Sequence, residues 1–193
     1  MRTNFSDAQE TKERKYRAFL ALPPPEGLLE MFKKFQKGKE KPPLRWSAPE
    51  KIHLTLFFWP SLNRNEFNNL WEYLMPKLKD NNLLKKYKSD IRGFHFFPKA
   101  QVIFLREISE EIFNLYENIK GNIKDIPKEF DFNKSESFTP HWTLARKFRY
   151  SHLIKYKKYF QSLDTFSFSE KTPSPVLYLS VDSIYESKPF IKG

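Results

Sequence analysis

The sequence His53-Leu54-Thr55-Leu56 occurs a second time, with one apolar exchange, as His141-Trp142-Thr143-Leu144. Each copy consists of His, any residue, Thr and an apolar residue, and each lies in an apolar run typical of a β-strand. Successive side chains of a strand alternate between its two faces, so the His and the Thr of each copy share one face. The sequence therefore predicts two strands that could together present two imidazoles and two hydroxyls to one site.

Apolar periodicity on either side of the two copies predicts alternating strands and helices. Asn63 and Glu66 predict a capping box at the start of the second helix, whereas Pro76 predicts its end or a kink, with a separate helical piece at 77–88. The element order predicts an α+β fold of two related lobes, each with an antiparallel sheet flanked by helices. Strands are expected at 16–22, 51–58, 90–97, 101–108, 140–148, 165–172 and 175–187, and helices around 26–37, 67–74, 112–119 and 153–163.

The length of 193 residues fits one domain. Residues 1–15 are polar and lack periodicity, so we expect a flexible N-terminal extension followed by a single bilobal domain over residues 16–193. The chain contains no cysteine, which excludes disulfides and thiolate chemistry and favours a cytoplasmic protein. No apolar run reaches the ~18 residues of a membrane span, and the N-terminus lacks the apolar core of a signal peptide. We therefore expect no membrane association.

The formal charge is +11, from 34 Lys and Arg against 23 Asp and Glu. Such a surplus favours a polyanionic partner, nucleic acid ahead of a membrane surface, although lysines can also serve solubility alone. Lys39–Arg45 and Lys147–Arg149 flank the two motifs and are the better candidates for contacting an RNA backbone. The chain has only 5 Gly and no glycine-rich phosphate-binding motif.

Two imidazoles at one site can share one proton and act as base and acid, because histidine titrates near neutrality. A Thr hydroxyl donates to an anionic oxygen without adding charge, which suits a phosphate. The pair of motifs, without an acidic cluster for Mg²⁺, therefore indicates metal-independent phosphoester chemistry. His95 and His152 have no Thr partner and are interpreted as structural or surface residues. Four scattered histidines predict no metal site, and no cofactor is implied.

Beyond the motifs, further stretches resemble a known family. The chain is similar to the 2H phosphoesterase superfamily, named for two His-x-Thr/Ser motifs, and within it to the RNA 2′,3′-cyclic phosphodiesterases, also called the 2′-5′ RNA ligase family. The stretches that carry the likeness are Arg17-Ala18-Phe19-Leu20-Ala21-Leu22, Arg45-Trp46-Ser47-Ala48-Pro49-Glu50-Lys51-Ile52, Gly93-Phe94-His95-Phe96-Phe97-Pro98 and Pro140-His141-Trp142-Thr143-Leu144-Ala145-Arg146.

This resemblance implies two pseudo-symmetric lobes with the His strands facing each other across a groove. It implies metal-free opening of an RNA 2′,3′-cyclic phosphate to a 2′-phosphate, with reversible 2′-5′ RNA joining as a further activity, by a monomer that needs no protein partner. His53 would be the general acid and His141 the general base, although pseudo-symmetry allows the reverse. Thr55, Thr143 and Arg146 would bind the phosphate. Two alternatives remain: a 2H enzyme for another cyclic or 2′,5′-linked phosphodiester, and an inactive RNA-binding module.

Two residues near the motifs test strand alternation. Strict alternation places Arg146 on the face opposite His141, so only a bulge or the strand end would bring it to the site; otherwise it faces solvent. Phe57 has the parity of His53 and could stack on a base, but a core position is the stronger expectation in a chain with 20 Phe. The family's Leu-Gly after the first motif is replaced here by Trp59-Pro60, so the following turn should differ.

Overall fold

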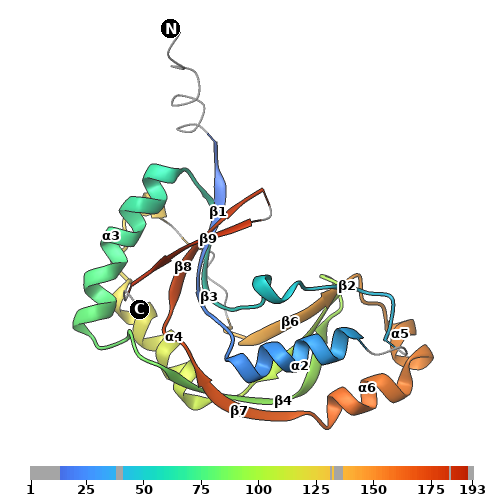
Figure 1. Ribbon diagram of the computed structural model, residues 1–193. Helices are drawn as coiled ribbons and strands as arrows, with labels where there is room; N and C mark the ends of the chain where they lie inside the picture. The colour runs from blue at the N-terminus through green and yellow to red at the C-terminus, as the bar shows by residue number, and fades with distance from the viewer. Residues whose placement is uncertain (1–13, 38–40, 131, 133–136, 183, 191–193) are drawn as a thin grey trace, which may run out of the picture.

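A computed structural model of the chain describes residues 14–37, 41–130, 132, 137–182 and 184–190. The expected N-terminal extension lies outside the described residues except for Arg14 and Lys15. The described strands form two antiparallel sheets, which confirms the predicted α+β fold of two lobes. Figure 1 shows helices flanking both sheets.

One sheet has four strands and the other has five. The order in the first is β3 (Leu54–Leu62), β1 (Tyr16–Leu22), β8 (Val176–Val181) and β9 (Ile184–Pro189). The order in the second is β2 (Arg45–Trp46), β6 (His141–Arg146), β5 (Val102–Glu107), β4 (Tyr87–Phe97) and β7 (Ser167–Thr172).

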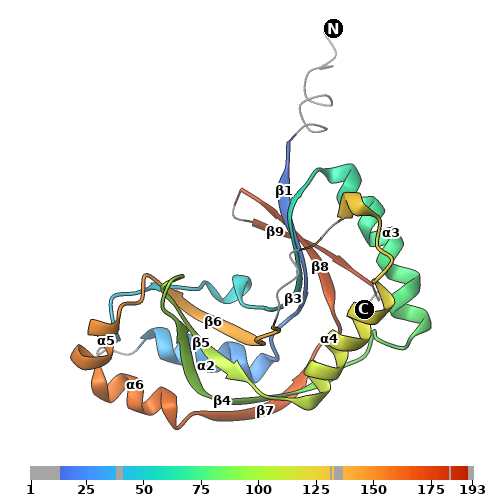
Figure 2. The ribbon, with the colours of Figure 1, turned by 180° about the vertical axis from the view of Figure 1, so that it is seen from behind.

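The chain passes back and forth between the two sheets. Strand β2 joins the five-stranded sheet although β1 and β3, before and after it, belong to the other, and the chain returns to the four-stranded sheet between β7 and β8. The two His strands, β3 and β6, approach each other where the sheets meet. Residues from both sheets thereby line one cavity. Figure 2 shows the two sheets from behind.

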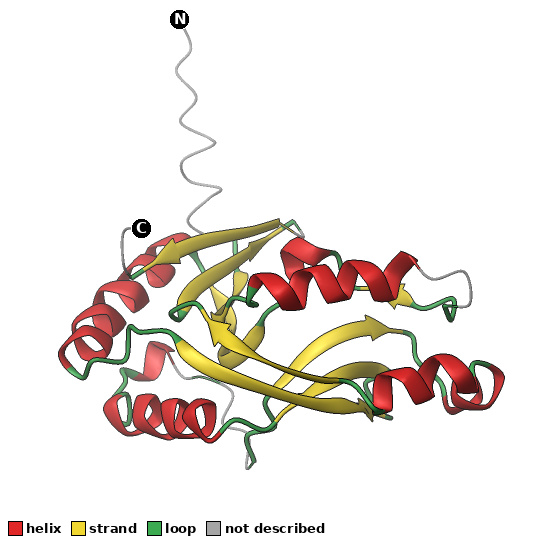
Figure 3. Ribbon diagram, turned by 60° about the horizontal axis from the view of Figure 1, so that its bottom comes forward, coloured by secondary structure: helices red, strands yellow, loops and turns green. Residues whose placement is uncertain are grey.

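The helices are α2 (Glu26–Lys37), α3 (Arg64–Asp80), α4 (Glu110–Asn122), α5 (Tyr150–Lys155) and α6 (Lys157–Asp164), with 3₁₀ turns η1 (Pro49–Lys51) and η2 (Lys128–Phe130). Helices α3 and α4 lie at one end of the molecule, and α5 and α6 lie at the other (Figure 1; Figure 3 shows the helices in red against the strands). Helices α4 and α6 both pack on β4.

The predicted capping box at the start of α3 is confirmed. The Glu66 amide donates to Oδ1 of Asn63 at 2.9 Å, and the Asn63 amide donates to Oε2 of Glu66 at 2.6 Å. The predicted end of this helix at Pro76 is wrong, because α3 continues to Asp80. Leu74 and Leu78, one turn apart, are fully buried and hold the helix on the core. Pro76, which has no amide hydrogen to donate within the helix, lies on the exposed side.

Three other boundaries differ from expectation. The helical piece at 77–88 does not form beyond Asp80, and β4 begins at Tyr87. The fourth helix is divided into α5 and α6 at Tyr156, whose backbone leaves the helical region with φ −115° and ψ 37°. The expected strand at 175–187 folds back as the β8–β9 hairpin, helped by Asp182 at φ 45°, a conformation that Asp tolerates.

No helix in the described part of the chain has both the length and the apolar character needed to cross a membrane.

Candidate active site

A cavity of about 570 Å³ lies between the two sheets, and all five residues predicted for the site line it. His53 and Thr55 reach it from the start of β3, and His141, Thr143 and Arg146 reach it from β6. Within each motif the intervening side chain is fully buried, Leu54 in one and Trp142 in the other, while each His and Thr is only half-buried. The predicted alternation of faces is therefore confirmed in both strands.

Each motif ends in a β-bulge, at its apolar fourth residue. Opposite β3, Leu20 pairs with Phe57 and the next residue of β1 pairs with Thr55, so Leu56 is the additional residue. Opposite β6, consecutive residues of β5 pair with Ala145 and Thr143, so Leu144 is the additional residue. A bulge resets the alternation of faces beyond it.

The bulges decide the positions of the two residues that alternation left open. In β6 the bulge at Leu144 turns Arg146 to the face of His141, where it lines the cavity. In β3 the bulge at Leu56 turns Phe57 inward, where it is 3% exposed and stacks on Tyr116 at 5.0 Å between ring centroids. Arg146 is thus at the site, and the expected core position of Phe57 is confirmed.

Both imidazoles are oriented by the same backbone contact. Nδ1 of His53 donates to the carbonyl of Lys51, and Nδ1 of His141 donates to the carbonyl of Thr139, each at 2.8 Å. A carbonyl only accepts, so these bonds fix the proton of each neutral ring on Nδ1. Nε2 of each ring is left to accept or donate a proton in the cavity.

Aromatic rings surround both imidazoles. His53 stacks on Phe19 with 4.4 Å between centroids and meets Tyr185 edge-on at 5.4 Å. His141 lies against Phe104 at 5.0 Å and meets Phe97 edge-on at 5.2 Å. Such surroundings remove water from the rings and disfavour their charged forms.

The pKa of each histidine is lowered, chiefly by this burial. The pKa of His53 falls to about 4; its bond to Lys51 opposes the shift, while the positive charges of His141 and Arg146 add to it. The pKa of His141 is lowered by burial and by Arg146, against its bond to Thr139. A proton on His141 lowers the pKa of His53, so the two imidazoles titrate as a coupled pair.

The cavity is strongly cationic. Arg17 from β1, Arg45 from β2, Lys51 from η1 and Arg146 from β6 all line it, together with the hydroxyls of Ser180 and Tyr185. The described residues that line it include no carboxylate. The site therefore suits an anion held between two imidazoles.

A second cavity, of about 600 Å³, meets the first at Thr55 and His141. Its lining is dominated by aromatic rings, those of Phe57, Phe58, Phe97, Tyr116 and Phe138. Phe57 and Tyr116 are buried and stack on each other, whereas Phe58, Phe97 and Phe138 are partly exposed and offer faces that can stack on a nucleobase. A cationic and an aromatic cavity thus adjoin at the two motifs.

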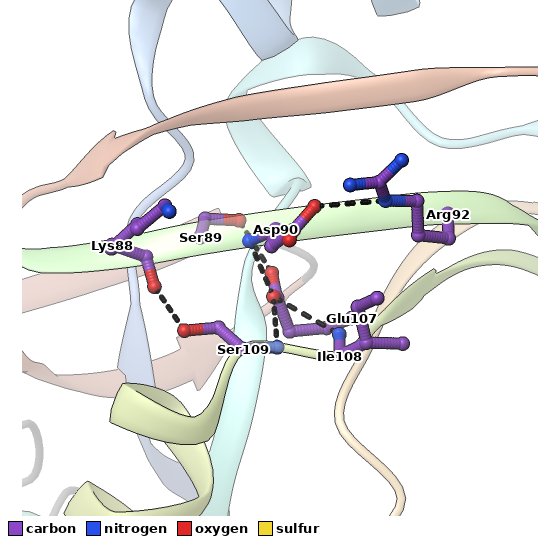
Figure 4. A network of polar contacts seen from close by, with 7 residues as sticks. All are labelled: Lys88, Ser89, Asp90, Arg92, Glu107, Ile108 and Ser109. Carbon is purple, nitrogen blue, oxygen red and sulfur yellow. Dashed lines mark hydrogen bonds and ion pairs between the residues drawn. The ribbon is translucent and has the colours of Figure 1, made fainter.

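Strand β6 is braced from behind by a buried carboxylate. Glu107, 1% exposed, accepts hydrogen bonds from the amides of Asp90 and Ser109 at 2.8 and 3.0 Å, and from the Ser89 hydroxyl. Figure 4 shows this network joining β4, β5 and the start of α4. Nε1 of Trp142 also donates to Glu107, at 3.0 Å. The residue between His141 and Thr143 is thereby fixed in place.

Of the other residues singled out in the sequence, one lines the cationic cavity and the rest do not. Arg45, within the candidate RNA-contacting segment Lys39–Arg45, lines the cationic cavity, whereas Lys147 and Arg149 do not. Residues 39 and 40 lie outside the described residues. His95 is exposed and, like His152, lines neither cavity. In the described segments, no three residues of the metal-ligating kinds converge on one point.

Sequence reasoning did not single out Arg17, Lys51, Ser180 and Tyr185 as site residues. Arg17 carried a signal, because it is the one charged residue within the apolar run 16–22, and it is the one exposed residue of β1. Lys51 lies only two residues before His53. Tyr185 pairs with Ser180 in the β8–β9 hairpin, and the pairing of β8 with β1 places Ser180 opposite Arg17, far away in the sequence. No local pattern encodes such pairings.

No protein-family model matches the chain. Among curated proteins, an RNA 2′,3′-cyclic phosphodiesterase of Thermotoga maritima is 24% identical over 123 residues, which are 62% of this chain and 61% of that protein. The match thus spans less than two thirds of the relative's length.

Solved structures match over more of the chain. E. coli LigT, crystallised with 3′-AMP, is 17% identical with a TM-score of 0.62, covering 92% of this chain and 95% of that one. TT0787 of Thermus thermophilus is 19% identical with a TM-score of 0.56, covering 84% and 86%. At this level of identity the matches show the fold, and they confirm its prediction.

Proposed function

The chain has the fold of the 2H phosphoesterases and a sequence match to an RNA 2′,3′-cyclic phosphodiesterase, and from this premise we propose that it opens RNA 2′,3′-cyclic phosphates to 2′-phosphomonoesters without a metal ion. The observation that carries the proposal is the convergence of both His-Thr pairs on one cationic cavity. Each imidazole is oriented there with Nε2 available for proton transfer.

The proposed reaction uses one imidazole as base and the other as acid. Nε2 of His141 takes a proton from a water molecule while the water oxygen attacks phosphorus. The bond from phosphorus to the 3′ oxygen breaks, and the proton on Nε2 of His53 passes to that oxygen. The products are a 2′-phosphomonoester and a 3′ hydroxyl. His141 ends protonated by the attacking water and His53 ends neutral, and proton exchange with solvent resets the pair.

Thr55, Thr143 and Arg146 bind the phosphate in this proposal. The two hydroxyls donate to its non-bridging oxygens, on which negative charge increases as water adds. Arg146, placed in the cavity by the bulge at Leu144, supplies a fixed positive charge. These donors are in position before the substrate binds, which is the arrangement that stabilises a transition state.

The acid role of His53 requires that it hold a proton when substrate is bound. In the free protein, burial and the positive charges of His141 and Arg146 keep its pKa near 4. A phosphate anion between the rings adds the opposite charge and raises the pKa of both imidazoles. Substrate binding itself thus brings the proton into the pair.

The aromatic cavity suits the base of the terminal nucleotide, since it adjoins the motifs at Thr55 and His141. An RNA 5′ hydroxyl in place of water would give a 2′-5′ linkage by the same displacement of the 3′ oxygen. Reversible RNA joining is therefore part of the proposal.

The test is product analysis of a short RNA that ends in a 2′,3′-cyclic phosphate, incubated with the protein in excess EDTA. We expect a 2′-phosphate as the sole monoester, at the same rate with and without EDTA. A 3′-phosphate product would contradict the proposed displacement, and a strict need for added metal would contradict the metal-free step. No turnover of any cyclic phosphate would leave the inactive RNA-binding alternative.

A further inference from the structure

The cationic cavity offers more positive charge than the reacting group needs. A 2′,3′-cyclic phosphate is a diester with one negative charge, and Arg146 together with the two Thr hydroxyls suffices to bind it. Arg17, Arg45 and Lys51 line the same cavity and have no task in that step. The volume of about 570 Å³ also lies in the range of pockets for whole small ligands, well above that of a single phosphate.

Part of this excess positive charge is located at Arg45 and Arg146. They are direct partners in the pairing of β2 with β6, and both side chains face the cavity. Directly opposed residues have Cβ atoms about 4.5–5.5 Å apart, and like charges at that distance destabilise a sheet. Within the described residues, no ion pair joins either arginine, or Arg17 or Lys51, to a carboxylate. A bound anion beyond the reacting phosphate would relieve this repulsion.

The segment that carries Arg45 is held rigidly by its neighbours. Nε1 of Trp46 donates to the Pro42 carbonyl at 3.2 Å, and its ring packs edge-on against Tyr159 at 5.9 Å. The carbonyl of Ser47 accepts from Gln36 at 2.7 Å, and its amide donates to Leu144 at 2.9 Å. Strand β2 is thus fixed to α2, α6 and the bulge of β6, so the side chain of Arg45 is presented with little loss of backbone entropy on binding.

We propose that Arg45, assisted by Lys51 and Arg17, binds a second phosphate of the substrate, the one on the 5′ oxygen of the terminal nucleoside. The inference rests on the proposed function and names its substrate class. The enzyme then acts on an RNA end or on a 5′-phosphorylated nucleotide in preference to a nucleoside cyclic phosphate alone. With the terminal base in the aromatic cavity, the RNA chain leaves the site past β2.

Calorimetric binding of product-type ligands tests the second phosphate independently of turnover. Adenosine 2′,5′-bisphosphate should bind the wild type about tenfold more tightly than adenosine 2′-monophosphate, as expected for one charge-assisted contact. Arg45→Gln should remove most of that ratio. Lys79→Gln, which removes one charge from the exposed side of α3, should keep it. Equal affinities in the wild type, or an unchanged ratio in Arg45→Gln, would overturn the proposal. Should Arg45→Gln fail to fold, Arg17→Gln on β1 serves as the second variant.

A series of three cyclic phosphates then separates the sources of the second phosphate. These are adenosine 2′,3′-cyclic phosphate, the same nucleotide with a 5′-phosphate, and the dinucleotide ApA with a 2′,3′-cyclic end. A gain in kcat/KM for the dinucleotide identifies RNA as the source, and a gain for the 5′-phosphate form alone identifies a nucleotide. Equal values for all three would refute the second subsite while the proposed function stands. If none is opened although the bisphosphate binds more tightly, the proposed function fails and the subsite stands.

Discussion

His53 and His141 occupy the same position of the same motif, yet their surroundings differ. The features they share are local: each Nδ1 donates to the carbonyl two residues before it, and a bulge follows each Thr by one residue. The features that differ come from the rest of the fold. β3 is an edge strand of the four-stranded sheet, whereas β6 lies between β2 and β5.

The difference separates the two imidazoles chemically. Phe19, Tyr178 and Tyr185 surround His53, and its pKa falls to about 4. His141 lies against Phe97 and Phe104 and stands in direct register with Arg106. A repeated motif thus supplies two equally oriented rings, and the two sheets give those rings different proton affinities. With His53 as the proposed acid, the bound phosphate has to overcome the low proton affinity of that ring.

Removing either imidazole should have the largest effect, because each performs a separate proton transfer. His53→Ala and His141→Ala should each lower kcat on an RNA cyclic phosphate by about 10³-fold or more. His152→Ala, whose ring lies outside both cavities, is the matched control and should stay within about twofold. Single-turnover rates with gel-purified RNA measure all three. Full activity in either of the first two variants would end the paired-imidazole mechanism.

The two hydroxyls test whether the motifs contribute equally to charge stabilisation. Thr55→Ala and Thr143→Ala should each lower kcat by about 10²-fold, since each removes one donor to the developing negative charge. Thr55→Ser and Thr143→Ser keep the donor and should recover most of the rate. A loss in KM alone would instead assign the hydroxyls to ground-state binding.

The motifs and their faces were predictable because they depend on a two-residue period that the sequence carries locally. Leu54 and Trp142 are buried, as that period requires, and the His and Thr of each motif face the cavity. The place of Arg146 was not predictable from its own strand. It depends on an additional residue, Leu144, that is recognised only from the pairing with β5.

Other features depended on packing between distant segments. Pro76 should end a helix by its local chemistry, but Leu74 and Leu78 hold α3 on the core. The aromatic neighbours of His53 come from β1 and the β8–β9 hairpin, far from it in sequence. The lowered pKa of His53 could therefore not be predicted from the motif.

The ring of His53, enclosed by aromatic neighbours, should also make folding stability depend on pH. Its pKa is about 4 in the folded protein against an ordinary value of 6.5, so the unfolded chain binds more protons between these values. Stability from this group is therefore fully present above pH 6.5 and is lost as pH falls, by about 3 kcal/mol near pH 4.

Urea unfolding at pH 7 and pH 4.5 measures how much His53 contributes to the pH dependence of folding stability, with His141 for comparison. His53→Gln should be less sensitive to the change of pH than the wild type by about 2–3 kcal/mol. His141→Gln should change the pH sensitivity in the same direction, because burial also lowers the pKa of His141. Equal pH sensitivity in wild type and His53→Gln would show that the ring of His53 is not held neutral by burial.

The smallest expected effect comes from Arg146, whose positive charge acts on both imidazoles. Arg146 lowers the pKa of His53 and of His141, so Arg146→Gln should move the pH profile of kcat/KM to higher pH by roughly half a unit. The wild-type profile should already fall with rising pH below pH 6.5, since kcat/KM reports the free protein and the pKa of both imidazoles is lowered there. Arg45→Gln removes a charge from the same cavity but from a residue that is not among the causes of either pKa shift, and its profile should move less.

Profiles from pH 4 to 8 at fixed ionic strength compare the three proteins. If Arg45→Gln moves the profile as far as Arg146→Gln does, the pair responds to the total charge of the cavity, and the bulge that places Arg146 beside the rings has no special part in setting their proton affinities.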